Sequence, residues 1–340
     1  MKTAMKKITE NTILVTGITG FIGFHVAKQL LGDGHKVIGI DNINDYYDPT
    51  LKMARLKYLQ ENFGDLLDFH KINVEDKEAV GKVWKSATPK ISHVVHLAAQ
   101  AGVRYSLINP YEYINSNVMG HLVLLELARH QEGFEHFVYA SSSSVYGSNE
   151  KMPFSESDPV NQPMALYAVT KRCDELMSYS YSHLFNLPTT GLRFFTAYGP
   201  WGRPDQALFI FTKKIIEGDP IPVFNHGKMK RDFTYVDDIK DGLIAALRKV
   251  PKAVGKKPPH EVYNLGNGKT STLMSYIQLI EENLGKKAKL DLQPMQPGDV
   301  PEASADISKA KQDLGFSPKT DTNIGVKNFI EWYKSYYKVD

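Results

Sequence analysis

Cysteine is almost absent from this chain of 340 residues, which contains only Cys173. One cysteine excludes an intrachain disulfide and any metal site built from several cysteines, and it favours a reducing compartment. The chain also lacks 18 consecutive uncharged apolar residues, and glycine and threonine interrupt the apolar stretch that follows the basic segment ending at Glu10. We therefore expect a cytoplasmic protein without a signal peptide or a membrane segment.

An excess of charge of one sign is missing as well. The 41 Lys and Arg residues face 38 Asp and Glu residues, which gives a net charge of +3. So small and dispersed a charge does not indicate nucleic acid as a partner. The histidines show no metal-ligand spacing, so no metal is expected. With 42% hydrophobic residues, the chain can bury one large core or two joined cores.

Short β-branched runs alternate with helix-length segments in the first half of the chain. This alternation predicts an α/β fold with a doubly wound parallel sheet, because parallel neighbours need crossover helices that then cover both faces. Glycine and proline become frequent after about residue 196, which indicates a smaller C-terminal lobe that supplies substrate contacts. We expect a large domain over residues 1–196, to which residues of about 232–266 return, and a lobe over 197–340. The expected strands are Thr12–Thr16, Lys36–Asp41, Leu66–Ile72, His93–Leu97, His136–Ala140 and Thr189–Phe194.

A glycine-rich turn follows the first expected strand. Gly17, Gly20 and Gly23 permit a tight turn and let backbone N–H groups approach a pyrophosphate at a helix N-terminus. Asp41 ends the second expected strand, where a carboxylate binds both ribose hydroxyls and repels a 2′-phosphate. Together they favour NAD over NADP. The alternatives are a plain strand-to-helix turn and a helix-capping role for Asp41.

A tyrosine and a lysine four residues apart are the candidate chemical groups. Tyr167 and Lys171 lie on one face of an expected helix, one turn apart. An ammonium stabilises a neighbouring phenolate, as a general acid/base requires. A serine run over residues 141–144 follows the fifth expected strand, and strand ends are where such sheets hold ligands. A serine hydroxyl there can bind a substrate oxygen while Tyr167 exchanges its proton; a plain polar turn is the alternative.

Three longer strings carry a specific resemblance: residues 96–106, 196–205 and 225–238. From Ile13 to about Lys334 the sequence resembles the extended short-chain dehydrogenase/reductases that act as nucleotide-sugar epimerases and dehydratases. Among these it is most similar to the UDP-glucuronate 4-epimerases. The resemblance implies a Rossmann-type fold, bound NAD, a UDP-sugar substrate, and epimerisation at C4 through a transient 4-keto sugar.

The resemblance also implies roles for individual residues. Tyr167 would be the base, Lys171 would tune it and bind the nicotinamide ribose, and Ser142 would be the hydroxyl partner, with Ser144 as second choice. Relatives usually carry an aspartate beside the adenine where this chain has Asn73 and Val74. The implied cofactor residues are Gly17, Gly20, Phe21, Ile22, Gly23, Asp41, Asn42, Asn44, Asn73, Val74, Ala98, Ala99, Gln100, Asn117, Tyr167 and Lys171.

For the substrate, the resemblance places Arg231 on the diphosphate, Phe224 on uracil and Asp299 on ribose. An Arg231–Asp232 ion pair, a core position for Phe224 and a solvated helix surface for Arg104 are the alternatives. The full set of expected substrate residues is Arg104, Ser142, Ser143, Ser144, Thr196, Arg203, Ala207, Leu208, Phe209, Phe224, Arg231 and Asp299.

The type of sugar depends on a few positions. Related dehydratases carry Asp-Glu, and related decarboxylases Glu, where this chain has Ser143 and Ser144; Thr196 and Arg203 suit a C6 carboxylate. These features favour UDP-glucuronate over UDP-glucose or a UDP-N-acetylhexosamine. A catalytically inactive NAD-binding regulator and a net reductase are the more distant alternatives. The resemblance further implies a homodimer formed through the helices expected over residues 107–129 and 165–185.

Overall fold

The computed structural model describes residues 12–339, so the basic segment through Glu10 lies outside the described residues. Seven parallel strands form the main sheet, in the order β11-β6-β5-β4-β1-β2-β3. The order reverses beside β1, and ligands bind at such a point beyond the carboxyl ends of the strands. The strands are β1 (Thr12–Thr16), β2 (Lys36–Asp41), β3 (Leu67–Lys71), β4 (Ile91–His96), β5 (His136–Ser142), β6 (Thr189–Phe194) and β11 (His260–Leu265).

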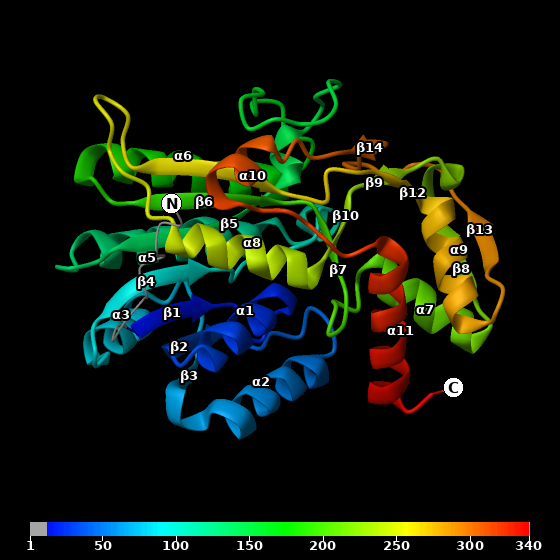
Figure 1. The fold of residues 1–340 in the computed structure, drawn as a ribbon, viewed down its shortest axis with the longest axis horizontal. Helices are drawn as coiled ribbons and strands as arrows, with labels where there is room; N and C mark the ends of the chain where they lie inside the picture. Colours follow the sequence, from blue (N-terminus) through cyan, green and yellow to red (C-terminus); the bar gives the residue numbers. More distant parts are fainter. Residues whose placement is uncertain (1–11, 340) are drawn as a thin grey trace.

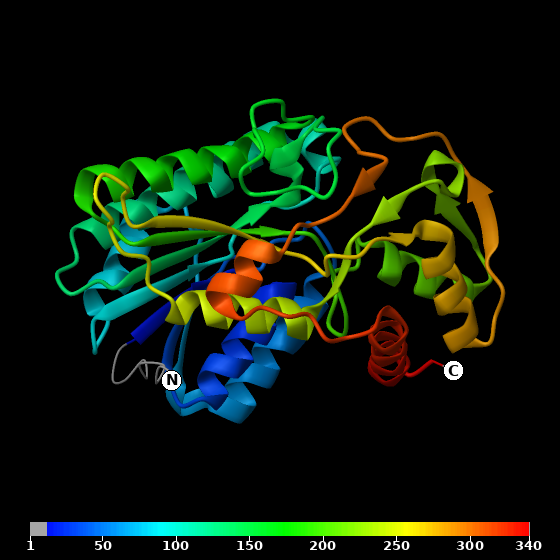
Figure 2. The same ribbon diagram turned by 45° about the horizontal axis from the view of Figure 1, so that its top comes forward.

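Helices cover both faces of this sheet (Figures 1 and 2), as parallel strands buried on both sides require. One face is packed by α1 (Phe21–Gly32), α2 (Pro49–Phe63), α8 (Val236–Arg248) and α10 (Ser308–Leu314). The other is packed by α3 (Lys77–Ser86), α5 (Gly120–Arg129) and α6 (Leu166–Phe185). None of the described helices is long and apolar enough to span a membrane.

A smaller lobe stands beside the carboxyl ends of the strands, at the right of Figure 1. Its own core is formed by α7 (Ala207–Glu217), α9 (Leu273–Leu284) and α11 (Thr322–Tyr337) around strand β8 (Pro220–Val223). Short strands complete it and join it to the large sheet: β7 (Thr196–Tyr198), β9 (Lys230–Arg231), β10 (Phe233–Tyr235), β12 (Ser271–Thr272), β13 (Lys289–Leu292) and β14 (Glu302–Ala303).

The parallel sheet and its helical layers are confirmed, and each of the six expected strands is present with its ends shifted by at most two residues. The helix expected over residues 107–129 begins three residues late, at Pro110, and then runs without interruption to Arg129. Its first turn is α4 (Pro110–Tyr113), and a π-helical turn, η3 (Ile114–Met119), joins α4 to α5. The boundary expected at residue 196 stays a prediction, although α8 and β11 do pack on the large sheet.

Candidate active site

A single continuous cavity of about 840 Å³ runs from the glycine turn after β1 to the C-terminal lobe. Its volume lies within the range of small-molecule and cofactor sites. The glycine turn and the end of β2 line one end, and the lobe lines the other with Phe224, Arg231 and Asp299. Tyr167, Lys171 and the serines after β5 line the middle.

The glycine turn is tight because side chains do not fit there. Gly17 has a φ of +69°, and a Cβ on it would lie 2.7 Å from the backbone nitrogen of Ala98 at the end of β4. A Cβ on Gly23 would lie 2.0 Å from the carbonyl oxygen of Gly17. The turn therefore brings bare backbone and the N-terminus of α1 to the cavity wall, which fits a dinucleotide pyrophosphate.

Asp41 lies at the end of β2 and anchors the same turn. Its carboxylate accepts hydrogen bonds from the backbone N–H of Thr19 at 3.0 Å and of Ile43 at 2.9 Å. No helix begins at this point, since α2 is capped by Asp48 instead, so the capping alternative is wrong. A carboxylate offers about four acceptor positions, so two are left for ribose hydroxyls.

The segment after β2 is held by a buried lysine. The Lys52 ammonium donates to the backbone oxygen of Asn44 at 2.8 Å and to its side-chain oxygen at 2.5 Å. Burial lowers the pKa of Lys52, chiefly because the charged form is removed from water. Lys52 lines the cavity together with Asn42, Asn44 and Tyr47, and thus adds a cation to the end that suits an anionic dinucleotide.

Tyr167 and Lys171 come from the first turns of α6. Tyr167 lines the cavity, and its ring packs edge-on against Tyr113 with 6.1 Å between ring centroids. Lys171 is 2% exposed and donates to the backbone oxygen of Ala140 at 3.1 Å and to the carboxylate of Asp174 at 3.0 Å. The helix therefore brings the phenol and the ammonium to the same stretch of the cavity wall.

The serines at the end of β5 make hydrogen bonds on two different sides of the chain. Ser141 donates to Glu175 at 2.6 Å and thus binds the protein interior. Ser142 donates to the hydroxyl of Ser144 at 3.1 Å and accepts the backbone N–H of Ser144 at 3.2 Å. All four serines have atoms on the cavity wall, but Ser142 and Ser144 form the hydroxyl pair that is available to a substrate oxygen.

The lobe end of the cavity carries two arginines around one carboxylate. Arg231 donates to Asp299 at 2.7 Å, and a nitrogen of Arg104 lies 3.9 Å from the same carboxylate. Asp232 instead accepts backbone N–H groups, so the Arg231–Asp232 alternative is wrong. The Arg104 guanidinium stacks on the Phe224 ring at 4.5 Å. A uracil on that face of Phe224 requires Arg104, which is about half exposed, to move aside.

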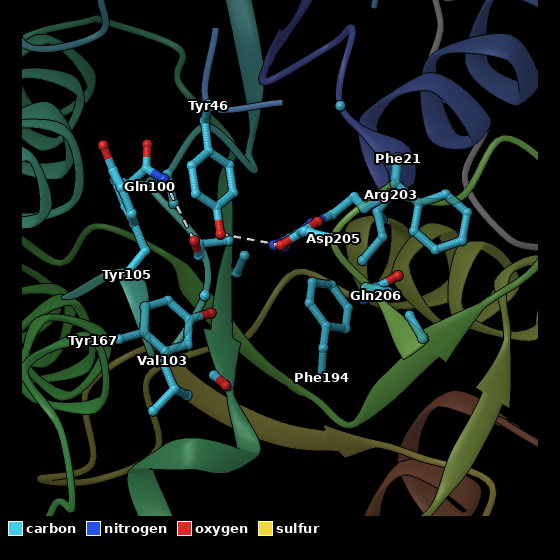
Figure 3. A pocket seen from close by; sticks show the side chains of 18 of the residues that line it. Phe21, Tyr46, Gln100, Val103, Tyr105, Tyr167, Phe194, Arg203, Asp205 and Gln206 are labelled. Atoms are coloured by element: carbon cyan, nitrogen blue, oxygen red, sulfur yellow. Dashed lines mark hydrogen bonds and ion pairs between the residues drawn. The ribbon is translucent and has the colours of Figure 1, made fainter. Parts of the chain in front are cut away.

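An arginine held by a carboxylate faces the space between the two ends (Figure 3). Arg203 donates to Asp205 through Nε at 3.0 Å and Nη2 at 2.5 Å, and the hydroxyl of Tyr46 donates to Asp205 at 3.1 Å. Burial acts to lower the pKa of Arg203, but the charge of Asp205 outweighs it and raises the pKa. The guanidinium keeps three N–H donors beyond those given to Asp205.

The cavity brings together most of the expected residues, and four lie elsewhere. Leu208 and Phe209 belong to the core of the lobe and line a separate space of about 20 Å³. Asn73 is not on the wall, whereas Val74 is. Asn117 is fully buried behind it, where its side chain accepts the N–H of Gln100 at 2.8 Å and donates to Thr170 at 2.9 Å.

Several residues on the cavity wall were not predicted from the sequence. Tyr46, Lys52 and Asp205 carry polar contacts described above, and Glu75 and Gln206 also line the cavity. Asp205 lies two residues after Arg203 in the 196–205 string, and that position is the one signal that points to it. Among residues 12–339, no three His, Cys, Asp or Glu side chains are grouped to hold a metal ion.

Comparison with known proteins agrees with this geometry. Residues 14–329 match the family described as GDP-mannose 4,6 dehydratase. UDP-glucuronate 4-epimerase 4 of Arabidopsis thaliana is 48% identical over 339 residues, which is 97% of this chain and 76% of that protein. A crystal structure of UDP-glucuronic acid 4-epimerase from Bacillus cereus, in complex with UDP-glucuronic acid and NAD, superposes with a TM-score of 0.85 at 32% identity, covering 96% of this chain and 100% of that one.

A UDP-glucose 4-epimerase of Thermotoga maritima, solved with UDP-glucose, has a TM-score of 0.84 at 30% identity over 96% of this chain and 99% of that one. The chain thus belongs to the extended short-chain dehydrogenase/reductase family of nucleotide-sugar epimerases and dehydratases, and within it to the relatives of UDP-glucuronate 4-epimerase. It is an NAD-dependent epimerase, and hence an isomerase.

Proposed function

We propose that this protein interconverts UDP-glucuronate and UDP-galacturonate by inverting C4. The observation that carries the proposal is the wall between the two ends of the cavity, where Thr196 and Arg203 are present and no carboxylate occupies positions 143 and 144. A threonine hydroxyl and a guanidinium suit a C6 carboxylate. Names of relatives support the same sugar, since both the Arabidopsis and the Bacillus proteins are UDP-glucuronate 4-epimerases.

In this proposal each end of the cavity binds one nucleotide. The glycine turn, Asp41 and Lys52 would bind NAD, whose nicotinamide can accept hydride from C4 and return it. Arg231 takes the diphosphate, while Asp299 and Phe224 contact the uridine. Holding the sugar through its diphosphate leaves the ring free to turn and present either face of C4 to the middle of the cavity.

Proton transfer falls to the residues in the middle. Tyr167 accepts the proton of the C4 hydroxyl as the sugar is oxidised and returns it when the epimer forms. Ser142, supported by Ser144, holds the C4 oxygen, and Lys171 stabilises the phenolate. Because the redox change is undone within one cycle, the protein needs no added cofactor and keeps its NAD.

The test is to incubate the purified protein with UDP-glucuronate, without added NAD, and to identify products by mass detection and proton NMR. We expect UDP-galacturonate of unchanged mass from the wild type and from Tyr337→Phe, a control on the lobe, and none from Tyr167→Phe. A product lighter by carbon dioxide, stoichiometric NADH absorbance, or turnover of UDP-glucose alone would each contradict the proposed reaction. No turnover of any UDP-sugar would point to the regulatory alternative.

We also propose that the protein is a homodimer. Large apolar side chains are exposed along the helices expected to form the interface. They include Ile108, just before α4, and Tyr111 on α4, which are 76% and 80% exposed, and Leu176, Tyr179 and Leu184 on α6. So much apolar surface on adjacent helices suits a second copy of the same face. A monomer mass by light scattering at assay concentrations would contradict this.

A further inference from the structure

A buried carboxylate lies behind the Tyr167–Lys171 pair and has no part in the reaction described so far. Asp174 follows Lys171 by one turn of α6 and is fully buried. Its Oδ2 accepts from the Lys171 ammonium at 3.0 Å, and the Ala140 carbonyl accepts a second ammonium N–H at 3.1 Å. Two of the three donors of Lys171 are therefore held by the protein.

We propose that Asp174 is a positioning residue that holds the Lys171 ammonium and offsets part of its charge, and thereby sets the pH range in which Tyr167 works as a base. This inference rests on the proposed role of Tyr167. An ammonium favours the phenolate form of a nearby tyrosine, whereas a carboxylate paired with that ammonium weakens the effect. Asp174 thus acts on the reaction through Lys171, without touching the substrate.

The titratable groups behind Lys171 on neighbouring strands and helices do not share this role, because they are uncharged. Burial lowers the pKa of His96, at the end of β4, to about 3. Burial also holds the pKa of His121, on α5, well below its ordinary value. The phenol of Tyr139 on β5 has its pKa raised well above 10 by burial. Asp174 is then the charged group that faces Lys171 from the protein interior.

Two other acids near α6 are engaged by arginines. Glu175 accepts from Arg193 at 2.8 and 3.0 Å and from Arg172 at 2.8 Å. Glu126 on α5 accepts from Arg129 at 2.8 Å. Five further titratable groups with shifted pKa values on or against α6 are neutral near pH 7: Tyr113, Tyr146, Cys173, Tyr181 and His260. Glu261 on β11 is a carboxylate; burial acts to raise its pKa, but hydrogen bonds from Lys257 and Lys309 hold the pKa low. Tyr105, another phenol, lies on the helical turn beside them.

The size of the effect follows from the spacing along the helix. Tyr167 and Asp174 are seven residues apart, which is about 10 Å along a helix axis. At the effective dielectric constant of a protein interior, one charge at that distance moves a titration by about one pH unit. Burial raises the pKa of Asp174, whereas the charge of the adjacent Lys171 ammonium and the hydrogen bond from it oppose that rise and favour the carboxylate.

The experiment compares the pH dependence of kcat in Asp174→Asn with that of the wild type. The protein is assayed with its bound NAD and with whichever UDP-sugar it epimerises. We expect the midpoint of the acidic limb to fall by about one pH unit in Asp174→Asn. Asp174→Glu, which keeps the charge, should stay near the wild type. Asp174→Ser, a smaller neutral side chain, should show the same fall and is the second variant if Asp174→Asn fails to fold.

Asp238→Asn is the matched control. Asp238 is another buried aspartate, 7% exposed, but it accepts backbone N–H groups of Lys319 and Thr320 away from the cavity. The substitution Asp238→Asn can lower the stability of the protein, but it should leave the midpoint of the acidic limb unchanged. Unchanged midpoints in both Asp174→Asn and Asp174→Ser would overturn the inference about Asp174 alone. An active Tyr167→Phe would instead overturn the proposed role of Tyr167 and this inference with it.

Discussion

Replacing Arg203 by methionine tests whether this guanidinium recognises the sugar carboxylate. Arg203 lines the cavity and is held by Asp205, which is itself held by Tyr46 from the segment after β2. Its remaining donors are available to a carboxylate, whereas the hydroxymethyl group of a neutral sugar gains little from a charge. Methionine keeps much of the length and removes the charge. We therefore expect a loss confined to uronate substrates.

The size of the loss in Arg203→Met can be estimated from the energy of the ion pair between Arg203 and the sugar carboxylate. Removing one partner of a buried, hydrogen-bonded charge pair costs about 2–5 kcal/mol. Asp205 already offsets much of the guanidinium charge, so the lower end applies. A loss of about 2 kcal/mol corresponds to roughly a 30-fold lower kcat/KM for UDP-glucuronate. In Arg203→Met the Asp205 carboxylate also loses its counter-charge and repels the uronate, so Arg203→Met combined with Asp205→Asn should recover part of the loss.

The assay measures kcat/KM for UDP-glucuronate and for UDP-glucose with each variant. In Arg203→Met we expect kcat/KM to fall for UDP-glucuronate and to change little for UDP-glucose, with bound NAD at the wild-type level. An equal fall for both sugars would show that Arg203 supports the structure of the cavity and does not read the carboxylate. Unchanged kinetics with UDP-glucuronate would refute the assignment outright.

Two further predictions concern the cofactor end and pH. Gly17→Ala should lose bound NAD and lower the free energy of unfolding by about 1–2 kcal/mol or more, because φ is positive at residue 17 and the added Cβ meets the backbone of Ala98. Gly34→Ala is the control, since Gly34 also has a positive φ of +86° but lies in open space, and it should keep NAD. The ratio of absorbance at the nucleotide and protein maxima measures bound NAD, and urea unfolding measures stability. The free energy of unfolding should fall as pH drops from about 6.5 towards 4. His96 and His136, with pKa values lowered by burial to about 3, bind protons only in the unfolded chain over that range, and urea midpoints at several pH values would show it.

The sheet could be predicted because its strands and helices appear in the sequence as short apolar runs that alternate with helix-length segments. Parallel strands that are buried on both faces appear in the sequence as short β-branched runs. The structure places all six expected strands next to one another in one sheet, on both sides of β1. The helix was predicted to start at residue 107, and Pro110 is the residue that should have indicated its true start. The π-helical turn that follows has no sequence signal that we can identify.

The site was predictable where its residues sit at strand ends or share a helix face. Gly17, Asp41, Tyr167 and Lys171 fall into that class. The contact between Tyr46 and Asp205 joins residues 159 apart in the chain, and only the packing of the two loops brings them together. Asp174 is different, because a residue three positions after Lys171 lies on the same helix face, so its contact with Lys171 could have been predicted from the sequence.

The proposed intermediate explains why these positions matter together. A 4-keto uronate is a β-keto acid, which loses carbon dioxide readily when an acid assists and the carboxylate is free to leave. Ser143 and Ser144 place hydroxyls on the wall where related decarboxylases carry a glutamate, so the assisting acid is absent. Arg203, fixed by Asp205 and Tyr46, would hold the carboxylate in place while the ring turns. If so, Arg203→Met should release some product lighter by carbon dioxide, whereas Ser144→Ala, which adds no acid, should release none.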